Sequence, residues 1–413
     1  MHLATVIFAL TYLLISLGEN SPRKLDRPTA AMLGAVLTVM SGSLTRGEAA
    51  AAIDLSTLAL LFGMMVLLAV MTRSGLPTWL AVRALHRCDT PQGLLALVVF
   101  SSGVSSALVL NDTVCLLGTP LLLHVTARAR LPATPYLLAL ATAANIGSVM
   151  TLTGNPQNMI IGNASGWGWA GFAARMVPIG LACLVIDWLL LRLLFRRLLS
   201  SAEISRETHA EPYPPVHRGL ALKSVLVFAG LLVAFLAGAP MDFAAVTAAI
   251  ALLVLANRPP REALEAVDWS LLLFFAGLFV VVEGFVKADR HLLERAMSAI
   301  GTQVGTASVA QFSAASVVGS NLFSNVPFVL IAGHWVGQMS EPRFVWLLLA
   351  LTSTFAGNLT LFGSVANVIV AQYARDESPL GFWDFLRAGV PVTLATTSVG
   401  VMLLCALRLL GLA

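Results

Sequence analysis

The sequence predicts an all-α protein that crosses a membrane several times. Of its 413 residues, 58% are hydrophobic and only 11% are charged, whereas soluble domains are roughly 45–50% apolar and about 25% charged. A water-soluble chain of this size could not cover its apolar surface with so few charges. The composition therefore argues against a soluble enzyme, a disordered chain and a nucleic-acid partner, and it makes the lipid bilayer the expected environment.

Apolar stretches long enough for a membrane-spanning helix, about 20 residues, recur along the chain. In the first half they cover residues 3–18, 29–44, 54–72, 135–163 and 176–195. In the second half they cover residues 222–237, 242–257, 268–286, 344–372 and 389–410. The only long polar stretch, 200–219, contains Pro, Glu, Arg and His, which predicts a linker. It separates a first half, 1–199, from a second half, 220–413.

One further apolar run in each half has polar residues at its centre. These runs, 94–126 and 306–338, are each long enough for two half-length helices. If each run enters the membrane and returns on the same side as a re-entrant hairpin, each half has five full crossings.

Short segments recur in the same order in the two halves, at a nearly constant separation along the chain. For example, DLSTLALLFG begins at Asp54 and DWSLLLFFAG begins at Asp268. The other matched positions are Asn111 and Asn325, Thr151 and Thr360, and Pro178 and Pro391. Because five crossings is an odd number, the second copy would be inverted relative to the first. Inverted repeats of this kind are typical of secondary transporters.

The charges fit a topology in which the N-terminus lies outside the cell and the linker lies in the cytoplasm. Most of the 25 Lys and Arg residues then fall on the cytoplasmic side, in line with the positive-inside rule. We expect a multi-pass protein of the plasma membrane. The four cysteines are scattered and no set of residues has metal-ligand spacing, so we expect no cofactor beyond Na+ or H+ as a coupling ion.

Four polar segments interrupt the apolar runs at membrane depth. Two are the tips of the predicted hairpins, residues 110–113 (LNDT) and 324–327 (SNVP). The other two, residues 151–158 and 357–367, break the fourth span of each half and are rich in Gly, Pro and Asn. Backbone that leaves a helix inside a bilayer is tolerated only where it is buried in protein or lines a cavity.

We expect these four segments to meet in one central site. A helix broken at mid-depth presents an N-terminus with a partial positive charge, which binds anions without Lys or Arg. Asn and Thr side chains and freed carbonyls would coordinate a cation beside it. The alternative for single Gly and Pro residues is a kink or a close helix contact, and Asn111 and Asn325 could instead cap short helices.

Acidic residues within the apolar runs are candidates for coupling transport to an ion, because a charge inside a bilayer is costly. Asp112 is the clearest candidate for binding a proton or a cation. Its alternative role is to cap the returning arm of the first hairpin. For Asp187, an ion pair with Arg192 or a place at the inner edge is favoured over a role in transport. Glu283 and His334 are expected at helix ends.

These segments resemble the ion transporter superfamily that contains the arsenite permeases, the NhaD-type sodium/proton antiporters, the melanocyte P protein and the divalent-anion/sodium symporters. The resemblance rests on LNDTVCLLGTPLLL (110–123), TLTGNPQNMIIG (151–162), SNVPFVLIAG (324–333) and GNLTLFGSVANVIVA (357–371). The motif pair GNPQN and GNLTLxGSxAN is typical of the arsenite-permease-like branch, also labelled anion permease.

The resemblance implies a scaffold part and a transport part, two re-entrant hairpins and two broken helices at the substrate site, an elevator-like movement and commonly a homodimer. By position, it implies a substrate- and ion-binding site made of Asn111, Asp112, Thr113, Thr151, Gly154, Asn155, Asn158, Ser324, Asn325, Asn358, Thr360, Gly363, Ser364 and Asn367. The Ser-Asn-Thr tip of the dicarboxylate and citrate symporters is absent, which argues against sodium coupling and a dicarboxylate substrate.

We therefore predict a secondary active transporter for a small anion, or for an uncharged oxyacid such as arsenite, coupled to a proton or to sodium. The alternative is a sodium/proton antiporter in which Asp112 exchanges the two cations. An intramembrane enzyme is disfavoured because the chain lacks HExxH, GxGD and GxSxG motifs. A passive channel is disfavoured because the chain lacks rings of charge.

Overall fold

The computed structural model describes residues 3–17, 25–85, 88–200, 214–289, 291 and 301–413. In this part of the chain the regular structure is helical throughout, and no strand occurs. Six of the described helices are long and apolar enough to cross a membrane. The predicted class, an all-α polytopic membrane protein, is thereby confirmed. Most of the predicted linker, 200–219, lies outside the described residues.

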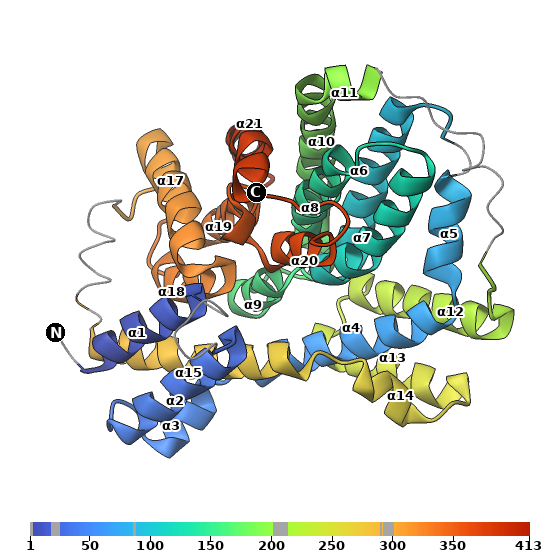
Figure 1. The fold of residues 1–413 in the computed structure, drawn as a ribbon. Helices are drawn as coiled ribbons and strands as arrows, with labels where there is room; N and C mark the ends of the chain where they lie inside the picture. The colour runs from blue at the N-terminus through green and yellow to red at the C-terminus, as the bar shows by residue number, and fades with distance from the viewer. Residues whose placement is uncertain (1–2, 18–24, 86–87, 201–213, 290, 292–300) are drawn as a thin grey trace.

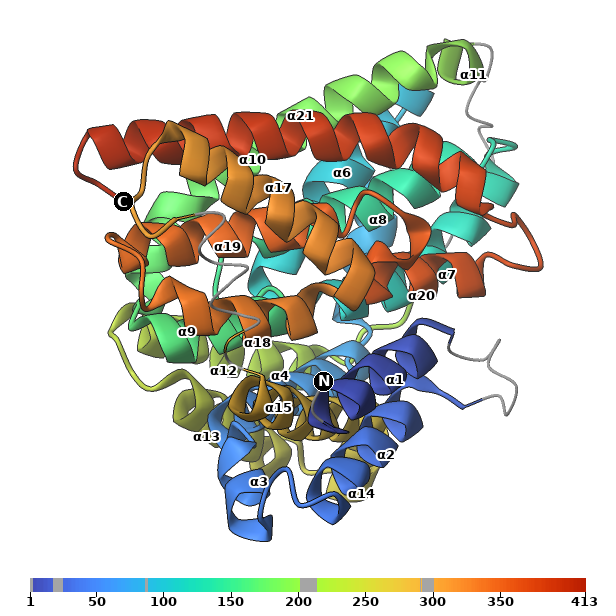
Figure 2. The same cartoon turned by 90° about the vertical axis from the view of Figure 1, so that its left-hand side faces the viewer.

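The helices form two layers, which Figures 1 and 2 show one above the other. The lower layer contains, from the first half, α1 (Leu3–Leu17), α2 (Arg27–Met40), α3 (Arg46–Ala52) and α4 (Leu55–Arg73), and, from the second half, α12 (Arg218–Leu236), α13 (Met241–Ala256), α14 (Pro260–Glu265) and α15 (Trp269–Ala288). The short helix α5 (Leu76–Leu85) follows α4 and leads to the upper layer.

The upper layer also draws on both halves. From the first half it contains α6 (Pro91–Leu108), α7 (Asn111–Arg128), α8 (Thr134–Ser148), α9 (Pro156–Ser165), α10 (Trp169–Leu194) and α11 (Arg196–Ser200). From the second half it contains α17 (Thr306–Phe323), α18 (Asn325–Val336), α19 (Pro342–Ala356), the 3-10 turn η3 (Leu361–Gly363), α20 (Val365–Tyr373) and α21 (Phe382–Leu409).

The two halves interlock in the lower layer through matched close contacts. α4 packs against α13 at Gly63, where a Cβ atom would lie 2.7 Å from the Ala245 backbone. α15 packs against α2 at Gly277, where a Cβ atom would lie 2.8 Å from the Ala31 backbone. The two glycines are matched positions of the two halves, and so are the two alanines. Small residues thus allow the same close approach of helices twice.

Ion pairs at the ends of these helices repeat in the same way. Lys287 Nζ lies 2.5 Å from Glu48 Oε1, and the Arg73 guanidinium pairs with the Glu262 carboxylate. Each pair joins the short helix of one half to the long helix of the other, and both the acidic and the basic residues are again matched positions. The sequence match therefore has a structural counterpart, although the inversion of the two copies relative to a membrane stays a prediction.

The two runs with polar centres form helical hairpins. α6 and α7 are joined at Val109 and Leu110, so Asn111 begins α7 instead of lying in the turn. α17 and α18 are joined at Ser324, whose φ of 71° lies in a region that residues other than glycine rarely adopt. Because α6 alone is long enough to cross a membrane, the re-entrant course of the hairpins stays a prediction.

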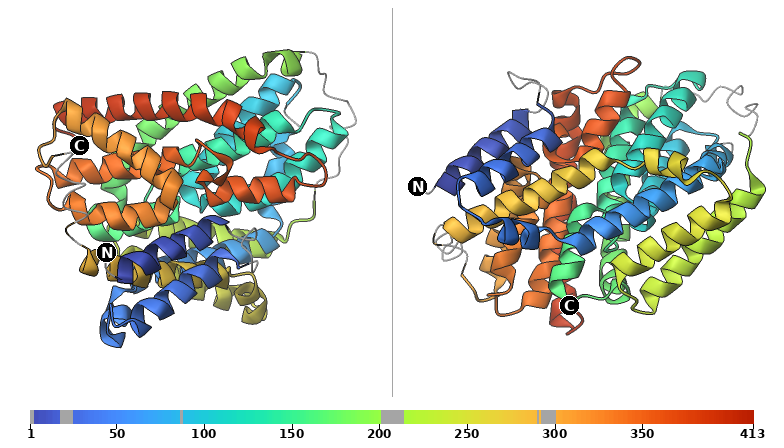
Figure 3. Two further views of the ribbon diagram at one scale, coloured as in Figure 1. Left: turned by 60° about the vertical axis from the view of Figure 1, so that its left-hand side comes forward. Right: turned by 90° about the horizontal axis from the view of Figure 1, so that it is seen from below.

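The fourth predicted span of each half is broken in the middle. α8 ends at Ser148 and α9 begins at Pro156, while α19 ends at Ala356 and α20 begins at Val365. α9 packs against α18 and α19, and α20 packs against α7 and α8. Figure 3 shows these short helices beside the hairpins of the upper layer. The breaks of both halves therefore lie in the same part of the molecule.

Large apolar side chains are exposed on the outer faces of both layers. Phe243 and Val254 on α13, Leu226 on α12 and Leu193 on α10 are all well exposed. Soluble proteins rarely expose so many large apolar groups. In a multi-pass membrane protein these side chains face lipid.

Candidate functional site

Each helix break is closed by one asparagine that bonds two freed carbonyls. Asn158 Nδ2 donates to Ser148 O at 3.2 Å and to Thr151 O at 2.9 Å. In the second half, Asn367 Nδ2 donates to Gly357 O at 2.7 Å and to Thr360 O at 3.1 Å. The donor and both acceptors of the first break match those of the second in sequence. These bonds satisfy backbone groups that a continuous helix would pair by itself.

A glycine in each break allows the chain to fold back on itself. A Cβ atom at Gly154 would lie 2.2 Å from Ser148 O, and one at Gly363 would lie 2.9 Å from Gly357 O. Gly154 O also accepts a hydrogen bond from Asn111 N at 3.0 Å, which joins the first break to the start of α7.

A threonine hydroxyl ties each break to the first arm of the neighbouring hairpin. Thr151 Oγ1 donates to Ala107 O at 2.5 Å, and Thr360 Oγ1 donates to Asn321 Oδ1 at 3.1 Å. Ala107 and Asn321 are matched positions at the ends of α6 and α17. The predicted site residues Thr151 and Thr360 therefore occupy matched positions, and each joins its helix break to the neighbouring hairpin.

Asn145, on α8, joins the two halves of the site. Its Nδ2 donates to Asn358 Oδ1 at 2.8 Å and to Asn367 Oδ1 at 3.0 Å. Its Oδ1 accepts from Asn111 Nδ2 and from Ser364 Oγ, both at 3.0 Å. We did not predict Asn145 from the sequence. The signal that could have found it is an asparagine inside the apolar run ATAANIG.

The residue that matches Asn145 in the second half is Thr354, and it makes fewer contacts. Its Oγ1 lies 3.4 Å from Asn155 Nδ2 and 3.2 Å from Gln157 Nε2. Asn155 also caps α9, since its Oδ1 accepts from Asn158 N at 2.8 Å. The bond from Asn155 to Thr354 matches the bond from Ser364 to Asn145 across the two halves.

We call Asn111, Asn145, Asn158, Asn325, Asn358 and Asn367 the asparagine cluster. All six side chains are buried. Asn325 does not cap α18; its side chain lies against the second break, where a Cβ atom at Gly357 would be 3.1 Å from Asn325 Nδ2. Asn111 and Asn325, which follow the two hairpin turns, therefore lie in contact with the two helix breaks, while their role in binding a substrate stays a prediction.

The hydrogen bonds of the asparagine cluster determine how each amide group is oriented and therefore which amide atoms have no partner. Asn367 donates with Nδ2, so its Oδ1 faces Asn145; Asn145 then offers its own Oδ1 to Asn111 Nδ2. The Oδ1 atoms of Asn111, Asn158 and Asn325 are buried without a hydrogen-bond partner among the described residues. So are the hydroxyls of Ser106 and Ser320, another matched pair. Buried polar atoms are nearly always paired, so a polar ligand is one way in which these atoms would gain partners.

Three predicted site residues lie outside these contacts. Asp112 is in the first turn of α7 and is half-buried; within the described structure its carboxylate accepts no hydrogen bond, so it is not a cap. It lies within electrostatic range of Arg27 on α2 and of Asp268, which caps α15. Asp112 therefore faces the lower layer. Thr113 is half-buried beside it, and Ser324 forms the turn of the second hairpin.

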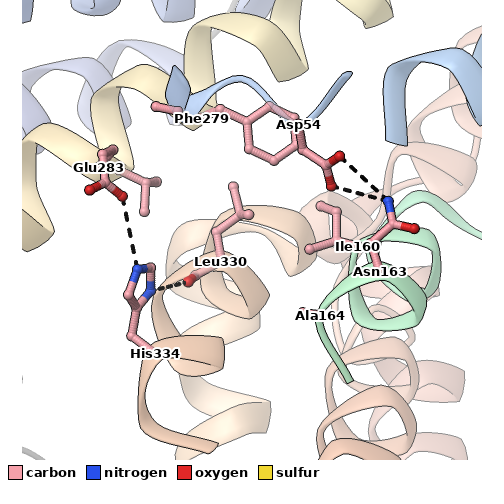
Figure 4. Close-up of a pocket in the computed structure, with 10 residues that line it drawn as sticks. Asp54, Ile160, Asn163, Ala164, Phe279, Glu283, Leu330 and His334 are labelled. Atoms are coloured by element: carbon pink, nitrogen blue, oxygen red, sulfur yellow. Dashed lines mark hydrogen bonds and ion pairs between the residues drawn. The ribbon is translucent and has the colours of Figure 1, made fainter. Parts of the chain in front are cut away.

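A cavity of about 400 Å³ lies between the layers, next to α9 and α18 (Figure 4). Asn163 Nδ2 donates to Asp54 Oδ2 across it at 3.2 Å, and His334 Nε2 lies 4.0 Å from Glu283 Oε2. The side chains of Glu283 and His334 are both partly exposed. His334 lies in the last turn of α18, as predicted, whereas Glu283 lies within α15, before its last turn. Among the described residues, no group of three or more His, Cys, Asp or Glu could hold a metal ion.

Known proteins resemble the chain along nearly its whole length. The citrate transporter family, CitMHS, matches residues 12–354. The silicon efflux transporter LSI3 of Oryza sativa subsp. japonica is 33% identical over 92% of this chain and 92% of its own length. The 46 kDa membrane protein of Mycobacterium leprae is 30% identical over 96% of each chain. The P protein of Sus scrofa is 28% identical over 97% of this chain and 58% of its own length.

These similarities agree with the fold and with the paired helix breaks. The predicted membership of the ion transporter superfamily is confirmed, and so is the prediction of a transmembrane transporter. The chain belongs to the citrate transporter family and is a multi-pass membrane transporter.

Proposed function

We propose that the protein is a secondary active transporter that binds a small oxyacid at the asparagine cluster and couples its movement to a proton or to sodium. The observation that carries this proposal is the set of buried amide oxygens without partners where the two helix breaks meet. A ligand that restores these hydrogen bonds would remove the cost of leaving them unpaired.

The unpartnered atoms favour a cargo that carries hydroxyl groups. Asn111, Asn158 and Asn325 each present an oxygen, which can only accept hydrogen bonds. An uncharged oxyacid can donate to these oxygens and can accept from the hydroxyls of Ser106 and Ser320. A fully ionised anion has no hydrogen to donate.

The charge of the site also favours a neutral cargo over citrate. Among the described residues, none of the side chains that form or bond the asparagine cluster is a Lys, Arg or His. In this part of the structure, a multiply charged anion would have only helix N-termini to neutralise it. The name of the rice relative specifies silicon, which dissolves as silicic acid, an uncharged molecule with only hydroxyl oxygens. Arsenite in its uncharged form has the same hydrogen-bonding pattern.

The two layers suit a moving part and a fixed part. The asparagine cluster belongs entirely to the upper layer, whereas the lower layer is interlocked by the contacts at Gly63 and Gly277. We propose that the upper layer carries the cargo in an elevator-like movement against the lower layer, with the two halves as inverted repeats. The cavity of Figure 4 lies on the boundary across which this movement would occur.

We propose Asp112 as the residue that binds the coupling ion. It lies on the moving layer and faces Arg27 and Asp268 of the fixed layer. Binding of a proton or sodium ion would change the charge at this boundary and so the balance between positions of the two layers. The matched residue in the second hairpin is Val326, so the proposed coupling site occurs in one half only.

Uptake into proteoliposomes tests this function. With an imposed pH or sodium gradient, purified protein should accumulate arsenite or silicic acid and should exchange labelled for unlabelled cargo without a gradient. Uptake of citrate with no uptake of either oxyacid would contradict the proposed cargo. Proton release on addition of sodium alone, with no oxyacid transport, would instead favour the sodium/proton antiporter.

A further inference from the structure

A second acidic residue is buried beside the site, on α10. The Asp187 side chain is 0% exposed. Its Oδ2 lies 3.1 Å from Thr142 Oγ1 on α8, and its Oδ1 has no partner among the described residues. The ion pair with Arg192 that the sequence favours does not form, because the Arg192 guanidinium lies over the Trp188 ring, 5.5 Å from its centroid.

No cation compensates the Asp187 carboxyl within the described structure. α6, α8, α11, α12 and α21 pack against α10, as Figure 1 shows for most of them. None of these helices brings a charged group into electrostatic range of Asp187. The titratable group that faces it is the Cys183 thiol of α10 itself, whose Sγ lies 3.5 Å from Thr396 O. A carboxylate in such surroundings would be an unpaired buried charge, which is strongly disfavoured.

The geometry at Thr142 indicates that Asp187 carries a proton. Thr142 Oγ1 lies within bonding distance of two acceptors, Leu138 O at 2.9 Å and Asp187 Oδ2 at 3.1 Å. A hydroxyl has a single proton to donate. If Thr142 donates to Leu138 O and a protonated Asp187 Oδ2–H donates to Thr142 Oγ1, both contacts are full two-centre hydrogen bonds. An ionised Asp187 would instead have to share the one Thr142 proton with Leu138 O.

Thr142 is also attached to the asparagine cluster. Its backbone oxygen accepts a hydrogen bond from Asn358 Nδ2 at 3.1 Å, and Asn358 Oδ1 accepts from Asn145. A change in how α8 sits against α10 at Thr142 would therefore act on the partners of Asn145. The path from the carboxyl to the cluster consists of two hydrogen bonds through one residue.

The matched contact in the second half contains no polar group. Asp187 corresponds to Gly400 and Thr142 to Leu351, and a Cβ atom at Gly400 would lie 2.9 Å from a methyl group of Leu351. An apolar side chain is therefore enough to pack α21 against α19. The carboxyl at the matching place between α10 and α8 is not needed for packing alone.

We propose that Asp187 is a second proton-binding site, through which proton binding and cargo binding at the asparagine cluster favour each other. When the proton leaves Asp187 for water, the Thr142 hydroxyl turns from Leu138 O to the carboxylate, and the remaining buried charge disfavours the close packing of α8 on α10. The Asn358 contact is then weakened. By linkage, cargo binding strengthens proton binding to the same extent.

Infrared difference spectroscopy of the purified protein tests the proton directly. We expect a carbonyl band of a protonated carboxylic acid that is absent from Asp187→Asn and that changes frequency on addition of arsenite or silicic acid. In Thr142→Val the band should shift, because its hydrogen-bond partner is removed. The same spectrum for the original protein and for Asp187→Asn at neutral and acid pH would overturn the proposal.

The pH dependence of cargo affinity tests the coupling, which rests on the proposed function. The Kd of the original protein should rise by up to about tenfold per pH unit once Asp187 loses its proton. Because Asp112, the proposed coupling residue, can also take up a proton, the comparison is made in the Asp112→Asn background. There Asp187→Asn should remove the remaining pH dependence below the pH at which the cargo itself ionises, since its amide donates to Thr142 as the acid does. Glu283→Gln, at an exposed carboxyl, should keep the original pH dependence. A pH dependence that persists when Asp187→Asn is added to Asp112→Asn would contradict the coupling.

The two experiments separate failure of the inference from failure of the proposed function. If the original protein binds neither oxyacid, the proposed cargo is wrong, and the infrared band still decides whether Asp187 holds a proton. If Asp187→Asn does not fold, Thr142→Val takes its place, with a shifted band and a shifted pH dependence expected. Unchanged behaviour of Thr142→Val in both measurements would overturn the proposal.

Discussion

The two helix breaks make the same bonds within themselves and different bonds with each other. Asn158 and Asn367 close the breaks in the same way, and Gly154 and Gly363 permit the same fold of the chain. Across the halves, however, Asn145 makes three hydrogen bonds, with Asn358, Asn367 and Ser364, and it makes a fourth with Asn111 in its own half. The matched Thr354 accepts two longer bonds from the other half.

This difference explains where the unpartnered atoms occur. Asn367 Oδ1 is satisfied because Asn145 reaches it, whereas the matched Asn158 Oδ1 is unpartnered because Thr354 has no amide to offer. The main hydrogen bonds between the two halves are therefore made by a residue of the first half, Asn145, to residues of the second half. We infer that the closing bonds within each break maintain the fold, while the bonds between the halves shape the place for the cargo.

Asn145→Ala should have the largest effect. It removes four buried hydrogen bonds and leaves their partners unsatisfied, which we expect to cost about 2–4 kcal/mol of stability and to abolish transport. Thr354→Ala is the matched control and should cost about 1 kcal/mol. Thermal unfolding in detergent and cargo exchange in proteoliposomes measure both. Equal losses in the two variants would contradict the special role of the first half.

Asp112→Asn should come next, because only the first hairpin carries a carboxyl at this position. Asp112 makes no hydrogen bond in the described structure, so the variant should fold as the original protein does. We expect it to lose transport driven by a pH gradient and to keep exchange of cargo without a gradient. Gradient-driven uptake at the original rate would show that Asp112 does not bind the coupling ion.

Gly154→Ala should be more harmful than Gly363→Ala. The added methyl group meets a backbone oxygen at 2.2 Å in the first break and at 2.9 Å in the second. Overpacking of this kind costs about 1–3 kcal/mol, with Gly154→Ala at the upper end. Melting temperatures of the two variants, compared with the original protein, test the order. A lower melting temperature for Gly363→Ala than for Gly154→Ala would contradict the tighter packing that we assign to the first break.

The smallest effect is expected in the lower layer, at its two matched ion pairs. Lys287 and Thr45 lower the pKa of Glu48 to about 2 by donating hydrogen bonds to its carboxylate. Because the pKa is lowered on folding, the pair adds stability above the ordinary pKa of 4.5 and loses it as the pH falls through about 2. Lys287→Ala should therefore be slightly less stable than the original protein near neutral pH.

This small difference should disappear in acid, and unfolding of both proteins at several pH values measures it. Arg73→Ala, at the matched pair, should cost more, since Arg73 also donates to the Glu262 backbone oxygen at 2.6 Å. A stability difference for Lys287→Ala that grows toward low pH would contradict the assigned pKa shift.

Much of this architecture could be predicted from the sequence, because apolar runs and helix-breaking residues act locally. The apolar spans, the helical hairpins and the two breaks follow from such patterns, and the paired Asn111 and Asn325 each begin the second helix of a hairpin. Asn145 was missed because a single asparagine within an apolar run does not reveal what it bonds. The unpaired state of Asp187 was missed because Arg192, although close in sequence, turns to Trp188 instead.

Binding of arsenite or silicic acid to purified Asn111→Ala and Asn325→Ala tests most directly whether one cargo is held by both halves. Each side chain offers one unpartnered oxygen, so each variant should lose about tenfold in affinity, the worth of one hydrogen bond. Asn325→Ala should do so without loss of stability, because its side chain makes no hydrogen bond in the described structure. If Asn325→Ala bound the cargo as tightly as the original protein, the second half would not contribute to the site, and the account of a shared site would be wrong.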